Sequence, residues 1–221
     1  MYQHKTRGGD PIALPVGKVV CIGQNYQDHI AEMKSQVAVE ALFFMKPATA
    51  LCDLSQPIAI PTQHGAVHNE TELAVLLQQP LKNASVEQVQ HSIWGYSLAL
   101  DLTLRDVQQQ LKQLGRPWEI AKGFDGACPM GPFLPQAECK HPQQLDFSLS
   151  VNGQLRQSGT TANMIRGIYQ MISEMSHWFT LQPGDIVLTG TPGGVGPLLP
   201  GDELHLQLAD KLNMTTKVIA A

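Results

Sequence analysis

Residues 145–153 read LDFSLSVNG, and this stretch decides the fold class. Its apolar residues alternate with polar ones at period two, which is typical of a strand with one buried face. The alternating apolar residues are Leu145, Phe147, Leu149 and Val151. The run meets Asn152-Gly153, a dipeptide that favours a tight hairpin turn because both residues accept a positive φ. The stretch therefore predicts an antiparallel hairpin, and residues 204–208 repeat the alternation near the C-terminus.

Strand patterns recur along the chain, whereas helical patterns are few. Short apolar or β-branched runs predict further strands at residues 18–23, 41–46, 70–77, 94–102 and 185–188. A capping box predicts a short helix over residues 85–93. Thr103 is expected to cap a second helix that stops at Gly115, and apolar spacing predicts a third over residues 163–179. Because strands and helices do not alternate regularly, we expect an α+β, β-rich fold with a few peripheral helices.

Composition excludes several classes of protein. The 221 residues include 15 Lys and Arg against 19 Asp and Glu, a net charge of −4, with no basic cluster for nucleic acid. No apolar run reaches the roughly 18 residues that a membrane-spanning helix needs. The length of the chain favours a single domain over residues 1–221. The N-terminus shows no apolar signal segment, so we expect the protein in the cytoplasm. The four cysteines lack metal-site spacing and are expected to be buried free thiols.

Two carboxylates lie two residues apart in HNETEL, residues 68–73. On a strand, Glu70 and Glu72 point to one face with Cα atoms about 7 Å apart, and such charges repel unless a cation or protons lie between them. Asp101 ends a second apolar run, where an acid is costly unless it is paired. Three carboxylates at strand ends would form an oxygen-only site for Mg²⁺, Mn²⁺ or Ca²⁺. The alternatives are a solvated pair of edge carboxylates and, for Asp101, a helix cap.

A candidate acid–base pair lies in GQNYQDHIAEM, residues 23–33. Asn25 is expected to cap a helical turn that places His29 and Glu32 on one face. A carboxylate beside an imidazole fixes the tautomer and raises the basicity, as removal of a proton from water requires. The alternative is an ordinary surface pair.

Positive charge is expected beside the carboxylates. Arg105 and Gln108 share a helical face after Asp101, and Lys122 lies in a segment punctuated by Gly and Pro that we expect to be a loop. Cations beside a metal would bind a carboxylated substrate, with ordinary salt bridges as the alternative. The glycine-rich TGTPGGVG, residues 189–196, lacks phosphate-loop spacing and by itself indicates a tight turn.

Seven segments taken in order resemble the fumarylacetoacetate hydrolase family, in its small single-domain branch. They are GQNYQDHIAEM, FFMKP, HNETELAVLL, ALDLTLRDVQ, PWEIAKGFDGACPMGP, VNGQLRQSGTTANMI and LQPGDIVLTGTPGGVGP. The resemblance implies a rolled, mixed β-sandwich and a homodimer.

The resemblance also implies roles for individual residues. The family's ligands for Mg²⁺ or Mn²⁺ fall on Glu70, Glu72 and Asp101. The family's catalytic residues, a His-x-x-Glu dyad on a lid-like helix and a lysine that holds the substrate, fall on His29, Glu32 and Lys122. The implied substrate-facing residues are Arg105, Gln108 and Thr191. Leu100 departs from the Asn or Gln that relatives often carry before the metal-binding Asp.

The implied activity is that of a Mg²⁺-dependent enzyme for a small 2-oxo acid. It would hydrolyse a C–C bond of an acylpyruvate, or tautomerise or isomerise an enol through a stabilised enolate. Decarboxylation of oxaloacetate at the same site stays open, and so does the physiological substrate. Two other readings are an iron oxygenase using His64, His68 and Glu70, and a non-catalytic Ca²⁺-dependent β module that binds a ligand.

Overall fold

Half of the described strands belong to one curled, mixed sheet in the computed structural model, which describes residues 2–33 and 40–221. The strand order is β2-β1-β13-β6-β7-β9-β3, and β10 pairs with β7. The strands are β1 (Val19–Gly23), β2 (Leu42–Lys46), β3 (Leu51–Asp53), β6 (Thr71–Leu77), β7 (Ile93–Leu100), β9 (Cys128–Met130), β10 (Leu134–Pro135) and β13 (Ile186–Leu188). The pairs β1–β13 and β3–β9 are parallel, and the other pairs are antiparallel.

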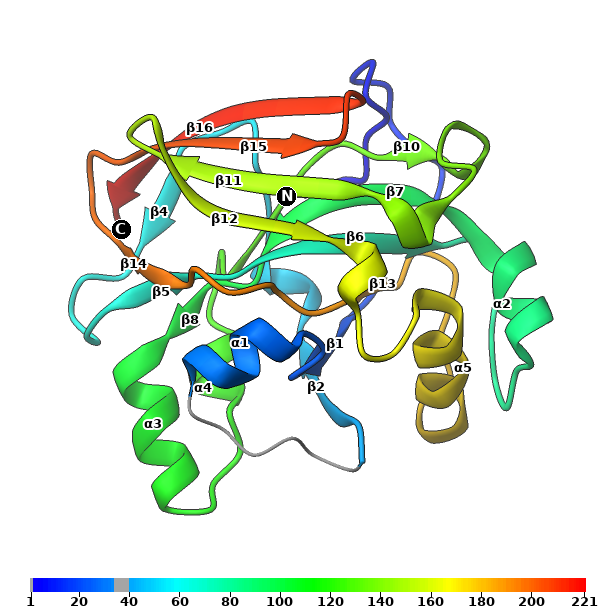
Figure 1. Cartoon of the computed structure of the whole chain (residues 1–221), viewed down its shortest axis with the longest axis horizontal. Coiled ribbons are helices and arrows are strands. Elements are labelled where there is room, and N and C mark those ends of the chain that lie inside the picture. The colour runs from blue at the N-terminus through cyan, green and yellow to red at the C-terminus, as the bar shows by residue number, and fades with distance from the viewer. Residues whose placement is uncertain (1, 34–39) are drawn as a thin grey trace.

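A second sheet packs over the first, with β11, β12, β15 and β16 lying over β6 and β7 in Figure 1. Its order is β12-β11-β15-β16-β4, and a small third sheet has the order β14-β5-β8. The bounds are β4 (Ile58–Ile60), β5 (Val67–Asn69), β8 (Thr103–Leu104), β11 (Asp146–Val151), β12 (Gln154–Thr160), β14 (Gly196–Leu198), β15 (Glu203–Leu208) and β16 (Leu212–Ala220). The predicted hairpin is confirmed as β11–β12, because Asn152 and Gly153 have φ of 52° and 76°.

Strand β6 is buried on both faces. One face carries Leu73, Val75 and Leu77 into a core shared with the second sheet and α5. The other face carries Ala74 and Leu76 into a separate apolar cluster, which N-terminal residues such as Tyr2 and Leu14 cover. A strand enclosed in this way has little freedom to shift, so the residues at its ends are held rigidly.

In the described part of the chain, five α-helices lie at the periphery of the sheets, with α1, α3 and α4 near one another and α2 and α5 at the other end (Figure 1). Their bounds are α1 (Gln27–Glu32), α2 (Val86–Ser92), α3 (Arg105–Gln113), α4 (Glu119–Lys122) and α5 (Ile168–Trp178). Single turns of 3₁₀ helix span Ala48–Ala50, Gln136–Glu138, Pro142–Gln144 and Thr161–Asn163. The predicted capping box is confirmed at Ser85 on α2, and Gly115 lies just beyond α3 with φ of 62°.

Three helix-start predictions are wrong. Thr103 belongs to β8, where its hydroxyl donates to the Asp101 carbonyl, and the N-cap of α3 is Leu104. Asn25 does not cap α1, because its side-chain amide binds Thr189 and the backbone of Arg166 instead. The third helix begins at Ile168, five residues later than expected, since Met164 forms a β-bridge with Tyr26 and the extended Gly167 is the N-cap.

All four cysteines are free thiols, and all but the half-buried Cys52 are buried. Within residues 2–33 and 40–221, none of the helices has the length and apolar character that crossing a bilayer requires.

Candidate active site

Three acidic side chains converge where β6 begins and β7 ends. Thr71 pairs with Leu100 across these antiparallel strands, so Glu70 and Asp101 are opposite each other, and the Asp101 N–H donates to the Glu70 carbonyl at 2.7 Å. Glu70, Glu72 and Asp101 are buried, and they offer one oxygen each within 4.8 Å of one another. Burial contradicts the solvated-edge alternative, and the start of α3 at Arg105 contradicts the helix-cap alternative for Asp101.

Cations surround two of these carboxylates. The Lys122 ammonium donates to Glu70 Oε2 at 2.8 Å and to Asp101 Oδ2 at 2.6 Å, and Arg105 pairs with the other Glu70 oxygen. Burial opposes ionisation of Glu70, but Lys122 and Arg105 outweigh it and lower the pKa of this carboxyl. Burial alone would lower the pKa of Lys122. The attraction of Asp101 and Glu70 is the larger effect, so the pKa of this ammonium lies above its ordinary value. Lys122 is the last residue of α4, so the predicted loop is a helical turn.

Lys46 is a site residue that the sequence analysis missed. It ends β2 with its side chain fully buried, and its ammonium lies 2.7 Å from Asp101 Oδ1. The same ammonium donates to the carbonyls of Leu102, Lys122 and Ala127. It therefore joins β2, the end of α4 and the Asp101 side chain. A lysine at the end of the apolar run ALFFMK was the available signal, because a buried ammonium needs a partner.

Glu72 is the one carboxyl of the three that forms no ion pair with the described lysines and arginines. One of its oxygens accepts a hydrogen bond from the Gly190 N–H at 2.6 Å. Burial, followed by repulsion from Asp101 and Glu70, raises the pKa of Glu72 well above its ordinary value. A divalent ion between the three carboxylates would remove this repulsion. An oxygen-only donor set of this kind fits Mg²⁺ or Mn²⁺, so the residues present suit a divalent metal ion.

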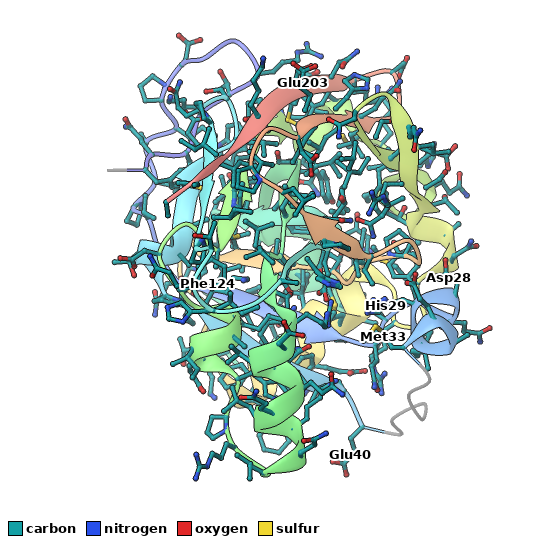
Figure 2. The ribbon with its side chains drawn as sticks, turned by 90° about the vertical axis from the view of Figure 1, so that its left-hand side faces the viewer. Asp28, His29, Met33, Glu40, Phe124 and Glu203 are labelled. Atoms are coloured by element: carbon teal, nitrogen blue, oxygen red, sulfur yellow. The ribbon has the colours of Figure 1, made fainter. Side chains whose placement is uncertain are left out.

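His29 and Glu32 both lie on α1, with His29 and the adjoining Met33 on its inner side in Figure 2. His29 is buried and lines the same cavity as the carboxylates, whereas Glu32 is exposed. The two are 3.8 Å apart from Nδ1 to Oε2, beyond hydrogen-bond length. Among the described residues, His29 Nδ1 has no hydrogen-bond partner. Burial lowers the pKa of His29, so its imidazole is neutral and able to accept a proton.

The glycine-rich segment contacts both α1 and the strands. Its Gly193 and Gly194 N–H groups donate to the carboxylates of Asp28 and Glu32 at 3.0 Å. Thr191 lines the cavity, but its hydroxyl donates to the Thr71 carbonyl at 2.9 Å. The segment is therefore more than the tight turn expected from its glycines, because it joins α1 to β6.

Gln157 on β12 is a second residue that the sequence analysis missed. Its side-chain oxygen accepts hydrogen bonds from Asn69 and from the Thr71 N–H, and its amide donates to Thr191 Oγ1 at 2.8 Å. This buried amide fixes the strand end that carries Glu70 against the TGTP turn. Nothing in its local sequence, QLRQSG, singles it out.

A cavity of about 50 Å³ joins these groups. Besides the carboxylates, it is lined by His29, Phe44, Arg105, Gln108, Lys112, Trp118, Lys122 and Thr191. Arg105 Nη1 donates to Gln108 Oε1 at 2.7 Å, so the predicted pair on α3 is present. Within the described residues the acidic triad is the one group arranged to bind a metal, and His64 and His68 do not join it. The geometry does not support the iron-oxygenase alternative.

Comparison with known proteins supports the same interpretation. A family model described as "Fumarylacetoacetate (FAA) hydrolase C-terminal" matches residues 18–219. Oxaloacetate tautomerase YcgM of Escherichia coli (strain K12) is 54% identical over 220 residues, covering 99% of this chain and 100% of that protein.

Two solved structures share the fold over almost the whole chain. A fumarylacetoacetate hydrolase family protein from Yersinia pestis CO92 has a TM-score of 0.97 and 52% identity, with 99% of this chain and 100% of that one covered. Fumarylpyruvate hydrolase from Pseudomonas aeruginosa, in complex with Mn²⁺ and pyruvate, has a TM-score of 0.93 and 34% identity. That match covers 100% of this chain and 96% of the other. The predicted fold class is confirmed.

Proposed function

The chain is an enzyme that belongs to the fumarylacetoacetate hydrolase family, and we propose that it interconverts the enol and keto forms of oxaloacetate with a bound divalent ion, Mg²⁺ in the cell. The observation that carries this proposal is the buried acidic triad facing Lys122 and Arg105 in one small cavity. The cavity brings these charged groups together, as the binding of a small 2-oxo acid requires. The similarity to oxaloacetate tautomerase YcgM supports the same substrate.

The negative charge that develops on the substrate during the reaction would lie beside positively charged groups of the chain. Glu70, Glu72 and Asp101 would hold the divalent ion, which supplies a Lewis acid for the 2-oxo oxygen and offsets the charge of an enolate. Lys122 and Arg105 would bind the substrate carboxylate or oxo group. His29 is neutral and borders the cavity, so it would take a proton from one position of the substrate and return it to another.

Hydrolysis of an acylpyruvate is the second candidate, and the position of His29 favours it. A buried imidazole at the cavity wall could deprotonate water for attack on the distal carbonyl, with Glu32 on the same helix to stabilise the imidazolium. The similarity to a fumarylpyruvate hydrolase supports this chemistry too. Hydrolysis needs an activated water, whereas tautomerisation needs only proton transfer.

A substrate panel on the purified protein tests the proposal. Enol-oxaloacetate, acetylpyruvate and fumarylpyruvate would be assayed with Mg²⁺, with Mn²⁺ and after treatment with a chelator, and release of CO₂ from oxaloacetate would be followed separately. We expect rapid, metal-dependent loss of the enol. In Asp101→Ala, turnover should fall on the order of 10³-fold or more, because a metal ligand and the partner of two buried lysines are lost. Undiminished turnover in that variant would refute the metal assignment, and metal-dependent CO₂ release without tautomerisation would favour a decarboxylase.

We further propose that residues 1–221 act as a single catalytic domain, that two chains form a homodimer, and that the enzyme is cytoplasmic. The family match over residues 18–219 supports one domain. The homodimer rests on the family resemblance. A molar mass of one chain by light scattering would refute the homodimer, and recovery in a membrane fraction would refute the cytoplasmic location.

A further inference from the structure

Among the described residues that line the cavity, one cation has no carboxylate partner. Arg105 and Lys122 both bind Glu70, but Lys112, which also lines the cavity, forms no ion pair with any described carboxylate. The residues that the structure does not describe, 1 and 34–39, include no Asp or Glu. Among the described residues, the ammonium of Lys112 therefore has no ion-pair partner.

Lys112 is the last of three polar residues that α3 places in a row along the cavity. Arg105, Gln108 and Lys112 are spaced i, i+3 and i+7, so they share one face of the helix. Arg105 contacts the acidic triad through Glu70, and Lys112 lies about 10 Å further along the helix axis. Since Lys112 is exposed and Gln108 is buried, the row runs from the carboxylates to the mouth of the cavity.

Lys112 and Lys122 each lie over one ring of a packed aromatic pair. The Lys122 ammonium lies 5.1 Å from the centroid of Phe44, and the Lys112 ammonium lies 5.1 Å from that of Trp118. The two rings meet edge to face with centroids 5.9 Å apart. A ring face holds an ammonium group in place without neutralising it. Partial burial of its stem, followed by the nearby Arg105, lowers the pKa of Lys112.

We propose that Lys112 is an anion subsite that binds the second carboxylate of a dicarboxylate substrate, while the 2-oxo acid end lies at the acidic triad and Lys122. The subsite rests on the proposed function, because it assumes that the 2-oxo acid end binds at the triad. It makes Lys112 a residue that selects dicarboxylates over 2-oxo acids with an uncharged tail. The flexible stem of lysine lets the ammonium follow diacids of slightly different length.

Oxaloacetate and pyruvate form a minimal pair for the test, because they differ by the second carboxylate alone. Calorimetry on the Mn²⁺-loaded protein would compare their affinities in the wild type, Lys112→Met, Lys112→Arg and the control Lys140→Met, which removes an exposed lysine outside the cavity. In Lys112→Met we expect oxaloacetate to bind about fivefold more weakly, as for a partly exposed ion pair, with pyruvate unchanged. Lys112→Arg should retain most of the affinity, and Lys140→Met should match the wild type.

The turnover assay separates failure of the subsite from failure of the function. Wild-type protein that prefers oxaloacetate through Lys112 but does not tautomerise it would refute the function and leave the subsite standing. Equal binding of the two acids by the wild type, no binding of either, or a parallel loss of both in Lys112→Met would overturn the subsite. Thermal unfolding of each variant would verify that it is folded.

Discussion

The ionic cluster at the strand ends and the short helix α1 border the same cavity, but they are held in different ways. Glu70, Asp101 and Lys46 are buried; Glu70 and Asp101 adjoin the ends of the enclosed strands β6 and β7, and Lys46 ends the edge strand β2. Helix α1 has six residues and no side-chain N-cap. It is attached to the glycine-rich segment by exposed hydrogen bonds, which the carboxylates of Asp28 and Glu32 accept. The difference indicates that the groups that hold charge are fixed by the core, whereas the proposed proton carrier lies on a weakly attached element.

Lys46→Met should have the largest effect on stability. The substitution leaves Asp101 with one fewer cation and removes the donor from three carbonyls, so we expect a loss of about 3 kcal/mol in the free energy of unfolding. Urea unfolding would measure it. The control is Lys217→Met, whose pair with Glu203 is exposed and whose removal should leave the midpoint unchanged. Equal midpoints for the two variants would show that the strand ends do not depend on this lysine.

His29→Asn should separate chemistry from stability. Turnover should fall about 10²-fold or more through loss of the acid–base group, while Mn²⁺ affinity by calorimetry and the unfolding midpoint stay near wild type. Acylpyruvate hydrolysis should suffer more than tautomerisation. A large loss of Mn²⁺ affinity would instead place His29 among the metal-binding groups.

The pH profile provides a second test of His29. Because burial lowers its pKa, the neutral, proton-accepting form persists below the ordinary value of 6.5. The acidic fall in turnover should therefore lie below pH 6.5 in the wild type, and activity should decline as pH falls through the folded-state pKa. Its midpoint should change or vanish in His29→Asn. A wild-type fall centred above 6.5 would contradict a buried neutral imidazole.

Glu32→Gln should have the smallest effect. The amide keeps an acceptor for the Gly194 N–H but removes the charge near His29, so we expect turnover to fall by about threefold to tenfold. Because Glu32 is exposed, the change in unfolding free energy should be within about 1 kcal/mol. A loss of stability as large as that of Lys46→Met would remove the distinction between the two regions.

Local patterns predicted the parts of the fold that local physics controls. The hairpin at Asn152-Gly153 follows from period-two alternation and from two residues that tolerate positive φ. The triad was also predictable, because acids inside or at the end of apolar runs need a partner. Asn25 and Thr103 fit a cap by local pattern, yet each side chain makes another hydrogen bond in the fold. Competing partners of this kind cannot be ranked from the sequence.

The sequence by itself determined which chemical groups are present and which strand ends carry the acids. Only the tertiary structure decided which cation neutralises which acid: Lys46 lies 55 residues from Asp101 along the chain but 2.7 Å away in space. It also decided that Glu32 binds Gly194 instead of His29, and that Lys112 at the cavity mouth has no ion-pair partner among residues 2–33 and 40–221. The physical reason is that electrostatic energy depends on separation and burial, and both are set by packing between segments distant in the sequence.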